Sequence, residues 1–163
     1  MAIIKIDYGS LNGGGGVLQE ETIYNNGLQY GTIETNVSSS ASASDQGTYL
    51  SVRVENATNK YAWLGIKVDL TDVDYVSFYD VSISSYASNA QAVYASPTMG
   101  SASMPSGAVY QLTTGANTPH KVILDVTSLT GENYVGICVY TGGQGGLRET
   151  QCSLIELVKF VFP

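Results

Sequence analysis

Few side chains in this chain could support catalysis. It contains one histidine, His120, and two cysteines, Cys138 and Cys152. A Ser-His-Asp triad would need that histidine, and no G-x-S-x-G elbow is present to expose a serine. Both cysteines lie within apolar alternation, where burial raises the pKa of a thiol and lowers its reactivity. We therefore expect the protein not to be an enzyme.

Zinc and phosphate motifs are also missing. A structural zinc site takes three or four Cys or His ligands at set spacing, and one histidine with two distant cysteines falls short of that. The glycines at 13–16 lack the Gly-Lys-Ser/Thr of a phosphate-binding loop.

The two cysteines allow at most one disulfide, and the sequence leaves open whether they lie close enough to bond. Two buried thiols are favoured, as in a reducing compartment.

Paired carboxylates are the remaining catalytic resource, since glycoside hydrolysis can run on two Asp or Glu side chains. The acidic residues nearest one another are Asp69, Asp72 and Asp74, in the stretch VDLTDVDYV, together with Glu20, Glu21 and Glu55. The three aspartates are also a minor candidate for a structural calcium site, because hard cations prefer oxygen ligands. Carboxylates in such turns more often accept backbone N–H groups. We expect no other metal and no cofactor.

The elements that position these residues are strands. Apolar residues recur with period two almost throughout, which is the pattern of a half-buried strand. Leu50, Val52 and Val54 alternate with polar or aromatic residues, as do Val135, Ile137 and Val139. The sequence predicts an all-β fold of about 9–11 strands, an antiparallel β-sandwich or barrel. Within DYVSFYDVSIS the alternation changes phase, which predicts a β-bulge near Tyr79 and Asp80.

Two segments do not fit this pattern. Residues 1–16 are expected to form an N-terminal strand or arm with a glycine-rich hinge, ahead of a sandwich domain at 17–163. This segment is either an ordered first strand followed by a loop or an arm that docks on a neighbouring subunit. The Ser/Ala-rich stretch at 36–47 is predicted to be a flexible loop.

Aromatic residues alternate with the aliphatic ones and are therefore predicted to face outward. The candidate ligand-binding residues are Tyr49, Arg53, Tyr61, Trp63, Tyr134 and Tyr140. Tyrosine and tryptophan combine a flat apolar ring with a polar tip, which suits a sugar ring or a protein partner. For Tyr61 and Trp63 a ligand platform, a subunit interface and a purely structural role all remain open, since aromatic residues also stabilise sheets.

The charge of the chain argues against two classes of partner. Seven Lys and Arg against fourteen Asp and Glu give a net charge of −7. Nucleic-acid binding depends on neutralising phosphates with basic side chains, and an anionic membrane surface attracts the same residues. We therefore expect neither partner. No apolar run is long enough to span a bilayer, and MAIIKIDYGS does not resemble a secretory signal.

Three stretches resemble a known family: WLGIKVDLTDVDYVSFYDVSIS, KVILDVTSLTGENYVGICVY and SLIELVKFVF. They are similar to the galactose-binding-like, carbohydrate-binding-module type of jelly-roll domain. In such domains a V-D-L-T-x-V-x-x-V-x-F strand pair precedes a D-V-S/T-S-L-x-G-x-Y-Y-I-G hairpin and a last strand. Residues 68–78 and 125–136 carry the match, with Val135 where an isoleucine is commoner. The resemblance covers about residues 48–162 and concerns strand and turn geometry, not a ligand.

Domains of this type occur in bacterial surface proteins and in phage virion proteins such as tail tips, fibres and head decorations. With no visible signal, the resemblance favours a non-enzymatic virion component. It would be made in the host cytoplasm, assemble with itself and other virion proteins, and bind host-surface glycans. The alternative is a bacterial carbohydrate-binding module from a surface or secreted protein. A small glycosidase or lyase using Asp72 or Asp74 is a third hypothesis.

Overall fold

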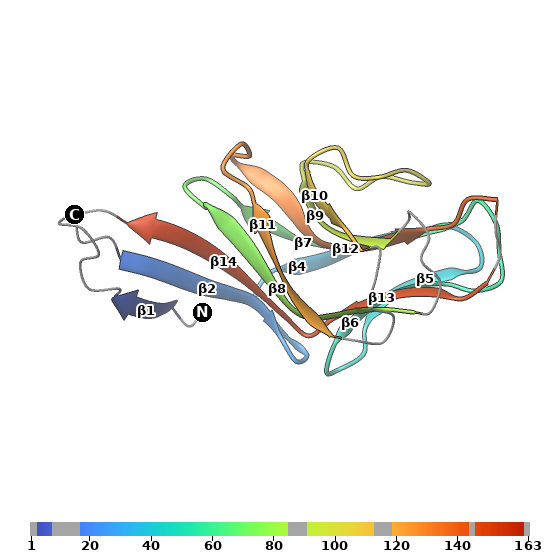
Figure 1. Cartoon of the computed structure of the whole chain (residues 1–163), viewed down its shortest axis with the longest axis horizontal. Coiled ribbons are helices and arrows are strands. Elements are labelled where there is room, and N and C mark those ends of the chain that lie inside the picture. The colour runs from blue at the N-terminus through green and yellow to red at the C-terminus, as the bar shows by residue number, and fades with distance from the viewer. Residues whose placement is uncertain (1–2, 8–16, 85–90, 113–118, 144–145, 162–163) are drawn as a thin grey trace.

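The fold is an all-β sandwich of two antiparallel sheets (Figure 1). The structure, a computed structural model, describes residues 3–7, 17–84, 91–112, 119–143 and 146–161. Every regular element in this part of the chain is a strand. The predicted fold class is therefore confirmed, with fourteen strands over the described ranges instead of about 9–11. No described helix could cross a membrane.

The larger sheet runs in the order β1-β2-β14-β8-β13-β6-β5, with β11 beside β8 and β3 beside β2. Its strands are β1 (Ile3–Asp7), β2 (Val17–Asn25), β3 (Leu28–Gln29), β5 (Ala41–Asp45), β6 (Leu50–Val54), β8 (Tyr75–Ile83), β11 (His120–Asp125), β13 (Arg148–Cys152) and β14 (Leu154–Val161). The smaller sheet runs β10-β9-β12-β7-β4. Its strands are β4 (Thr32–Val37), β7 (Tyr61–Asp69), β9 (Gln91–Ser96), β10 (Ala108–Gln111) and β12 (Glu132–Tyr140).

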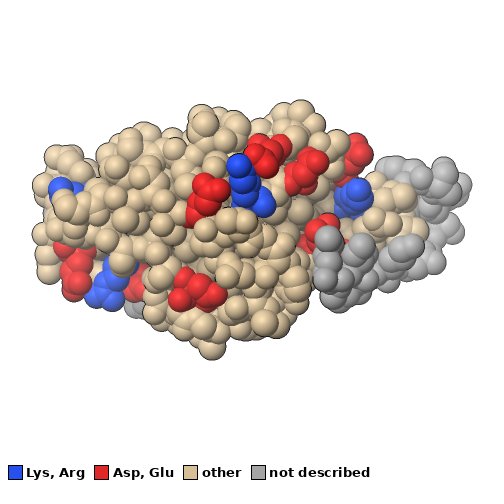
Figure 2. All heavy atoms as spheres, turned by 180° about the vertical axis from the view of Figure 1, so that it is seen from behind, with Lys and Arg blue, Asp and Glu red and all other residues tan. Residues whose placement is uncertain are grey.

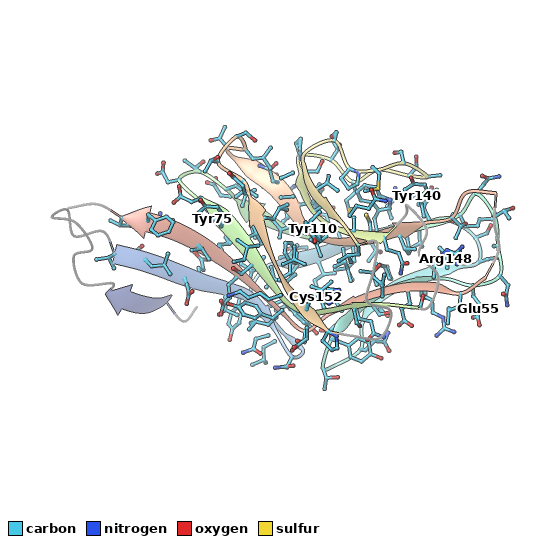
Figure 3. The ribbon with its side chains drawn as sticks, in the orientation of Figure 1. Glu55, Tyr75, Tyr110, Tyr140, Arg148 and Cys152 are labelled. Atoms are coloured by element: carbon cyan, nitrogen blue, oxygen red, sulfur yellow. The ribbon has the colours of Figure 1, made fainter. Side chains whose placement is uncertain are left out.

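The core lies between the two sheets and is built from the aliphatic positions of the period-two pattern. The predicted inward sets, Leu50, Val52, Val54, Val122, Leu124, Val135, Ile137 and Val139, are all buried. Arg148 and Cys152 of β13 are buried as well and lie between the layers (Figure 3). Alternation therefore predicted correctly which side of these strands faces the core.

The predicted bulge is present in β8. His120 pairs with Val81, whereas Val122 pairs with Phe78, so β8 contains one residue more than β11 between these pairs. Asp80 has a φ of 52°, in the left-handed region. The extra residue lets Val76 and Phe78, and then Val81 and Ile83, all reach the core.

Two sequence predictions about the strands were wrong. Residues 36–47 do not form one flexible loop, because β5 lies within them and pairs with β6. Its small residues alternate, with Ala41 and Ala43 packed against the core and Ser42 exposed. The hairpin that the resemblance implies at residues 125–136 is not formed either: β11 and β12 are the two strands joined there, but β11 pairs with β8, whereas β12 pairs with β7 and β9 in the other sheet. The chain crosses from the larger to the smaller sheet at this turn. The alternation of apolar residues does not predict which sheet a strand joins.

The first strand lies at an edge of the larger sheet. β1 pairs with β2 over Ile3–Asp7, and the proposed glycine hinge falls outside the described residues. In Figure 1, β1, β2 and the end of β14 project on the left beyond the smaller sheet. The arm and its docking on a neighbouring subunit stay a prediction from the sequence.

Candidate functional site

Four of the six candidate binding residues lie together on the outer face of the smaller sheet. Tyr61 and Trp63 are on β7, and Tyr134 and Tyr140 are on the adjacent β12. Their neighbours along each strand, such as Leu64 and Val139, point into the core, so these rings point the other way. We call this surface the aromatic face. Figure 3 shows Tyr140 near the end of β12.

The centre of the aromatic face is buried. Trp63 and Tyr94 are 0% exposed and, with Ala92 and Cys138, form a second apolar cluster separate from the core. The two rings meet edge to face, with centroids 4.9 Å apart and planes at 66°. The Tyr94 hydroxyl donates to the Leu64 carbonyl at 3.1 Å, and burial raises the pKa of Tyr94 well above its usual value. Trp63 points outward from the smaller sheet, as predicted, but it is not exposed to solvent, so the expectation of an exposed ring was wrong.

A loop covers the cluster. Residues 97–107, which we call the roof loop, connect β9 to β10, and Met99 and Met104 pack against the cluster. The Trp63 indole N–H donates to the Ser101 carbonyl at 2.9 Å. The Asn36 amide donates to the Gly100 carbonyl at 2.8 Å. Two side chains of the sheet therefore hold the roof loop over the aromatic face.

One end of the aromatic face remains accessible and carries two tyrosines. Tyr61 and Tyr140 are directly opposite each other in the β7–β12 register, and both are half-buried. Lys60 precedes Tyr61 in the chain, and its ammonium donates to the Ser39 hydroxyl at 2.6 Å. Each ring of this tyrosine pair offers apolar surface and a hydroxyl at its tip, the combination that suits a polyhydroxylated ligand.

The other end of the aromatic face is charged. The Tyr134 hydroxyl donates to a Glu34 carboxylate oxygen at 2.9 Å, and this bond raises the pKa of Tyr134. Lys67 forms an ion pair with Glu132 at 2.7 Å, which raises the pKa of the lysine. The Lys67 ammonium also lies 5.9 Å from the centre of the Tyr134 ring. These groups can exchange hydrogen bonds with a polar ligand, but they are already paired with one another.

Tyr49 and Arg53 do not join this surface. Arg53 lies on β6 of the larger sheet, where Leu50, Val52 and Val54 face the core, and alternation places Tyr49 on the same outer side. Arg53 forms an exposed ion pair with Glu55 at 3.2 Å. Its neighbours across the strands are Ser42 and Glu149. The six predicted residues are thus divided between two opposite faces of the sandwich.

The three aspartates considered for calcium make separate contacts. Asp69 accepts the Thr71 backbone N–H at 2.9 Å, and the Thr71 hydroxyl and N–H hold its pKa below the usual value. Asp74 accepts the Phe160 N–H at 2.8 Å. Within the described ranges, no group of three or more His, Cys, Asp or Glu is placed to hold a metal ion. Asp72 and Asp74 line an open depression of about 490 Å³.

The two cysteines are free thiols. Cys138 belongs to the cluster on the outer face of the smaller sheet, whereas Cys152 belongs to the core. Burial raises the pKa of Cys152 to about 12 and places the pKa of Cys138 well above its usual range. The favoured state of two buried thiols is confirmed, because the two thiols lie on opposite sides of the smaller sheet.

Sequence reasoning missed Tyr94, Asn36 and the roof loop. Tyr94 occurs in the short strand β9, in which every residue is buried. The alternation of apolar and polar residues that distinguishes an inner from an outer face is therefore missing around it. The signal for the roof loop was its two methionines within an otherwise small and polar segment. Methionine in such a loop indicates apolar packing, which alternation does not detect.

Charged side chains do not gather into a basic patch on the face seen in Figure 2, where most of the surface is uncharged and basic groups lie apart from each other. The net charge of the chain is −7, and the expectation that nucleic acid is not the partner stays a prediction from the sequence.

The fold is similar to that of carbohydrate-binding modules. No protein-family model and no curated protein sequence matches the chain. Among solved structures, a family 29 carbohydrate-binding module is similar with a TM-score of 0.50 and 11% identity, over 86% of this chain and 88% of its own. A mutant family 29 module complexed with cellulohexaose has the same TM-score and identity, over 86% of this chain and 91% of its own.

Proposed function

We propose that this protein is a non-catalytic glycan-binding module, and that the glycan lies on the aromatic face at the Tyr61–Tyr140 pair. The observation that carries the proposal is the position of these tyrosines, directly opposite each other and half-buried on the outer face of β7 and β12. The similarity in fold to carbohydrate-binding modules supports it. Sugar C–H groups pack on the rings, while the two tyrosine hydroxyls provide hydrogen bonds at the edge.

Tyr140 is the residue with which to test this proposal. It belongs to neither apolar cluster, so its ring can be removed without opening the core. We expect Tyr140→Ala to weaken binding of a glycan identified on a glycan array by roughly 10-fold, or about 1.4 kcal/mol. Isothermal titration calorimetry measures the change.

Tyr110→Ala is the matched control. Tyr110 lies on β10 of the same sheet and is 51% exposed, but its neighbour Val109 packs against the outer cluster, so its own ring points to the other side. Its loss is expected to leave the affinity unchanged. Absence of binding to every glycan, or equal losses in the two variants, would contradict the proposal.

The setting of the module is a separate question. The virion role, assembly with other virion proteins and homo-oligomers remain predictions from the sequence, and a bacterial surface or secreted protein accommodates the same module equally well. Light scattering on the purified protein distinguishes the two settings in part, because the virion hypothesis expects an oligomer. A strict monomer would count against it.

A further inference from the structure

The contacts of the roof loop resemble those that a bound sugar would make. Trp63 and Asn36 are cross-strand partners on β7 and β4, and both direct an N–H group at the roof loop. The acceptors are the carbonyl oxygens of two consecutive residues, Ser101 for Trp63 at 2.9 Å and Gly100 for Asn36 at 2.8 Å. Two adjacent N–H donors beside an aromatic ring could bind the oxygen atoms of a sugar. Here carbonyl oxygens of the roof loop accept both hydrogen bonds instead.

The indole ring of Trp63 is covered in a similar way. Gly100 lies so close to the indole that a Cβ atom on this residue would come within 2.8 Å of the ring. Only a residue without a side chain can lie there, so the backbone at Gly100 rests directly against the ring. The Gly100–Ser101 backbone, with its two carbonyl acceptors, therefore occupies space against the indole that a sugar could occupy.

The roof loop has little internal structure to hold it closed. Among the described residues, its one backbone–backbone hydrogen bond outside the strands joins the Ser103 N–H to the Ser101 carbonyl at 2.8 Å. Ser101, Ala102 and Ser103 are exposed. A segment with few backbone hydrogen bonds and exposed residues belongs to the low-stability part of a fold. Its attachment depends mainly on Trp63, Asn36 and the two methionines.

From these contacts we propose that Trp63 and Asn36 form a closed sugar-binding subsite, in which the Gly100–Ser101 backbone of the roof loop takes the place of the ligand. This inference rests on the proposed function and extends it from the Tyr61–Tyr140 pair along β7. A glycan that reaches Trp63 displaces the roof loop and takes over both N–H donors. Because only molecules with an open roof loop can bind at Trp63, the apparent affinity equals the intrinsic affinity multiplied by the open fraction.

Fluorescence tests the proposal directly, because Trp63 is the single tryptophan of the chain. In the free protein we expect blue-shifted emission with little quenching by acrylamide, since the indole is fully buried. Titration with cellulohexaose, or with a glycan identified on an array, should shift the emission and alter the quenching. This measurement needs no variant and therefore does not depend on how well a mutant folds.

Gly100→Ala tests the same point by mutation, because its Cβ would push the roof loop away from the indole. We expect increased acrylamide quenching without ligand and a glycan affinity roughly tenfold tighter than that of the wild type. Gly142→Ala is the control, since a Cβ at Gly142 meets no atom within 4 Å. It should change neither the quenching nor the affinity.

The outcomes separate this inference from the function on which it rests. If glycan binds and depends on Tyr140, while Trp63 emission and quenching stay constant and Gly100→Ala leaves the affinity unchanged, the closed subsite is refuted and the glycan-binding function stands. If no glycan binds to the wild type or to Gly100→Ala, the proposed function itself is refuted. A glycan that binds only to Gly100→Ala supports the closed subsite.

Discussion

At the scale of single residues, Glu156 combines burial with an ionisable group. It lies on β14 and is 9% exposed, and it accepts a hydrogen bond from the Tyr79 hydroxyl at 3.0 Å. Burial raises the pKa of Glu156, the Tyr79 hydrogen bond lowers it, and the nearby Glu20 raises it further. The net direction is upward, so the folded protein holds this proton more tightly than the unfolded chain does.

This direction predicts how stability depends on pH. A carboxyl whose pKa is raised by folding stabilises the protein while it is protonated, and this contribution is lost as the pH rises through the folded-state pKa. We expect Glu156→Gln, which keeps an acceptor for Tyr79, to raise the free energy of unfolding at pH 7 by less than about 1 kcal/mol. The difference should disappear near pH 4. Urea unfolding at both values measures it.

Glu55→Gln is the control for this experiment. Glu55 is an exposed glutamate in a surface ion pair with Arg53, and such pairs contribute about 0–1 kcal/mol. Its replacement should not raise the stability at pH 7. A Glu156→Gln variant that is less stable than the wild type at pH 7 would show that the carboxylate is stabilised by its surroundings, contrary to this prediction.

At the scale of strands, alternation in the sequence predicted orientation but not partners. It placed Tyr61, Trp63 and Tyr140 outward on β7 and β12, and Val135 and Ile137 inward. The phase change at Asp80 even predicted a bulge. It did not show that β11 and β12 belong to different sheets, because a period of two is the same whichever strand lies alongside.

The sequence pattern also did not predict that the roof loop covers Trp63. Whether an outward residue reaches solvent depends on what lies over it, and the contacts of Trp63 with Gly100 and Ser101 join residues far apart in the chain. Period and propensity are local quantities, so they carry no information on such contacts. This is why the candidate site was predicted in its orientation but not in its exposure.

Close packing of the central strands gives a prediction at this scale. Gly136 of β12 pairs with Gly65 of β7, and a Cβ at Gly136 would collide with the Leu64 carbonyl oxygen and the Gly65 Cα. Because these are backbone atoms, Gly136→Ala must move β12 away from β7. We expect a loss of roughly 2–3 kcal/mol in the free energy of unfolding, measured by urea titration.

Gly143→Ala provides the comparison. Gly143 follows β12, and a Cβ there would meet no atom within 4 Å, so its effect should stay within about 0.5 kcal/mol. Similar losses in the two variants would mean that the contact between β12 and β7 is looser than the structure indicates.

At the scale of the whole molecule, the larger sheet extends past the smaller one. β1, β2 and β14 form the projecting end (Figure 1), and among the described strands β1 pairs with β2. An edge strand with one neighbour contributes little to the core between the sheets. The core residues for which the structure describes side chains, from Ile23 to Leu157, lie within 17–163. The sandwich should therefore fold without its first strand.

We expect a protein comprising residues 17–163 to keep the β-sheet circular dichroism spectrum and the buried-tryptophan emission of the full chain. Its loss of unfolding free energy should stay below about 2 kcal/mol. Light scattering should give the same number of subunits as for the full chain, because β1 pairs with β2 of its own chain. The new edge, β2, carries Glu20 and Glu21, and charged side chains at an exposed edge oppose strand-to-strand association. An oligomer that dissociates when residues 1–16 are removed would show instead that this segment docks on a neighbouring subunit.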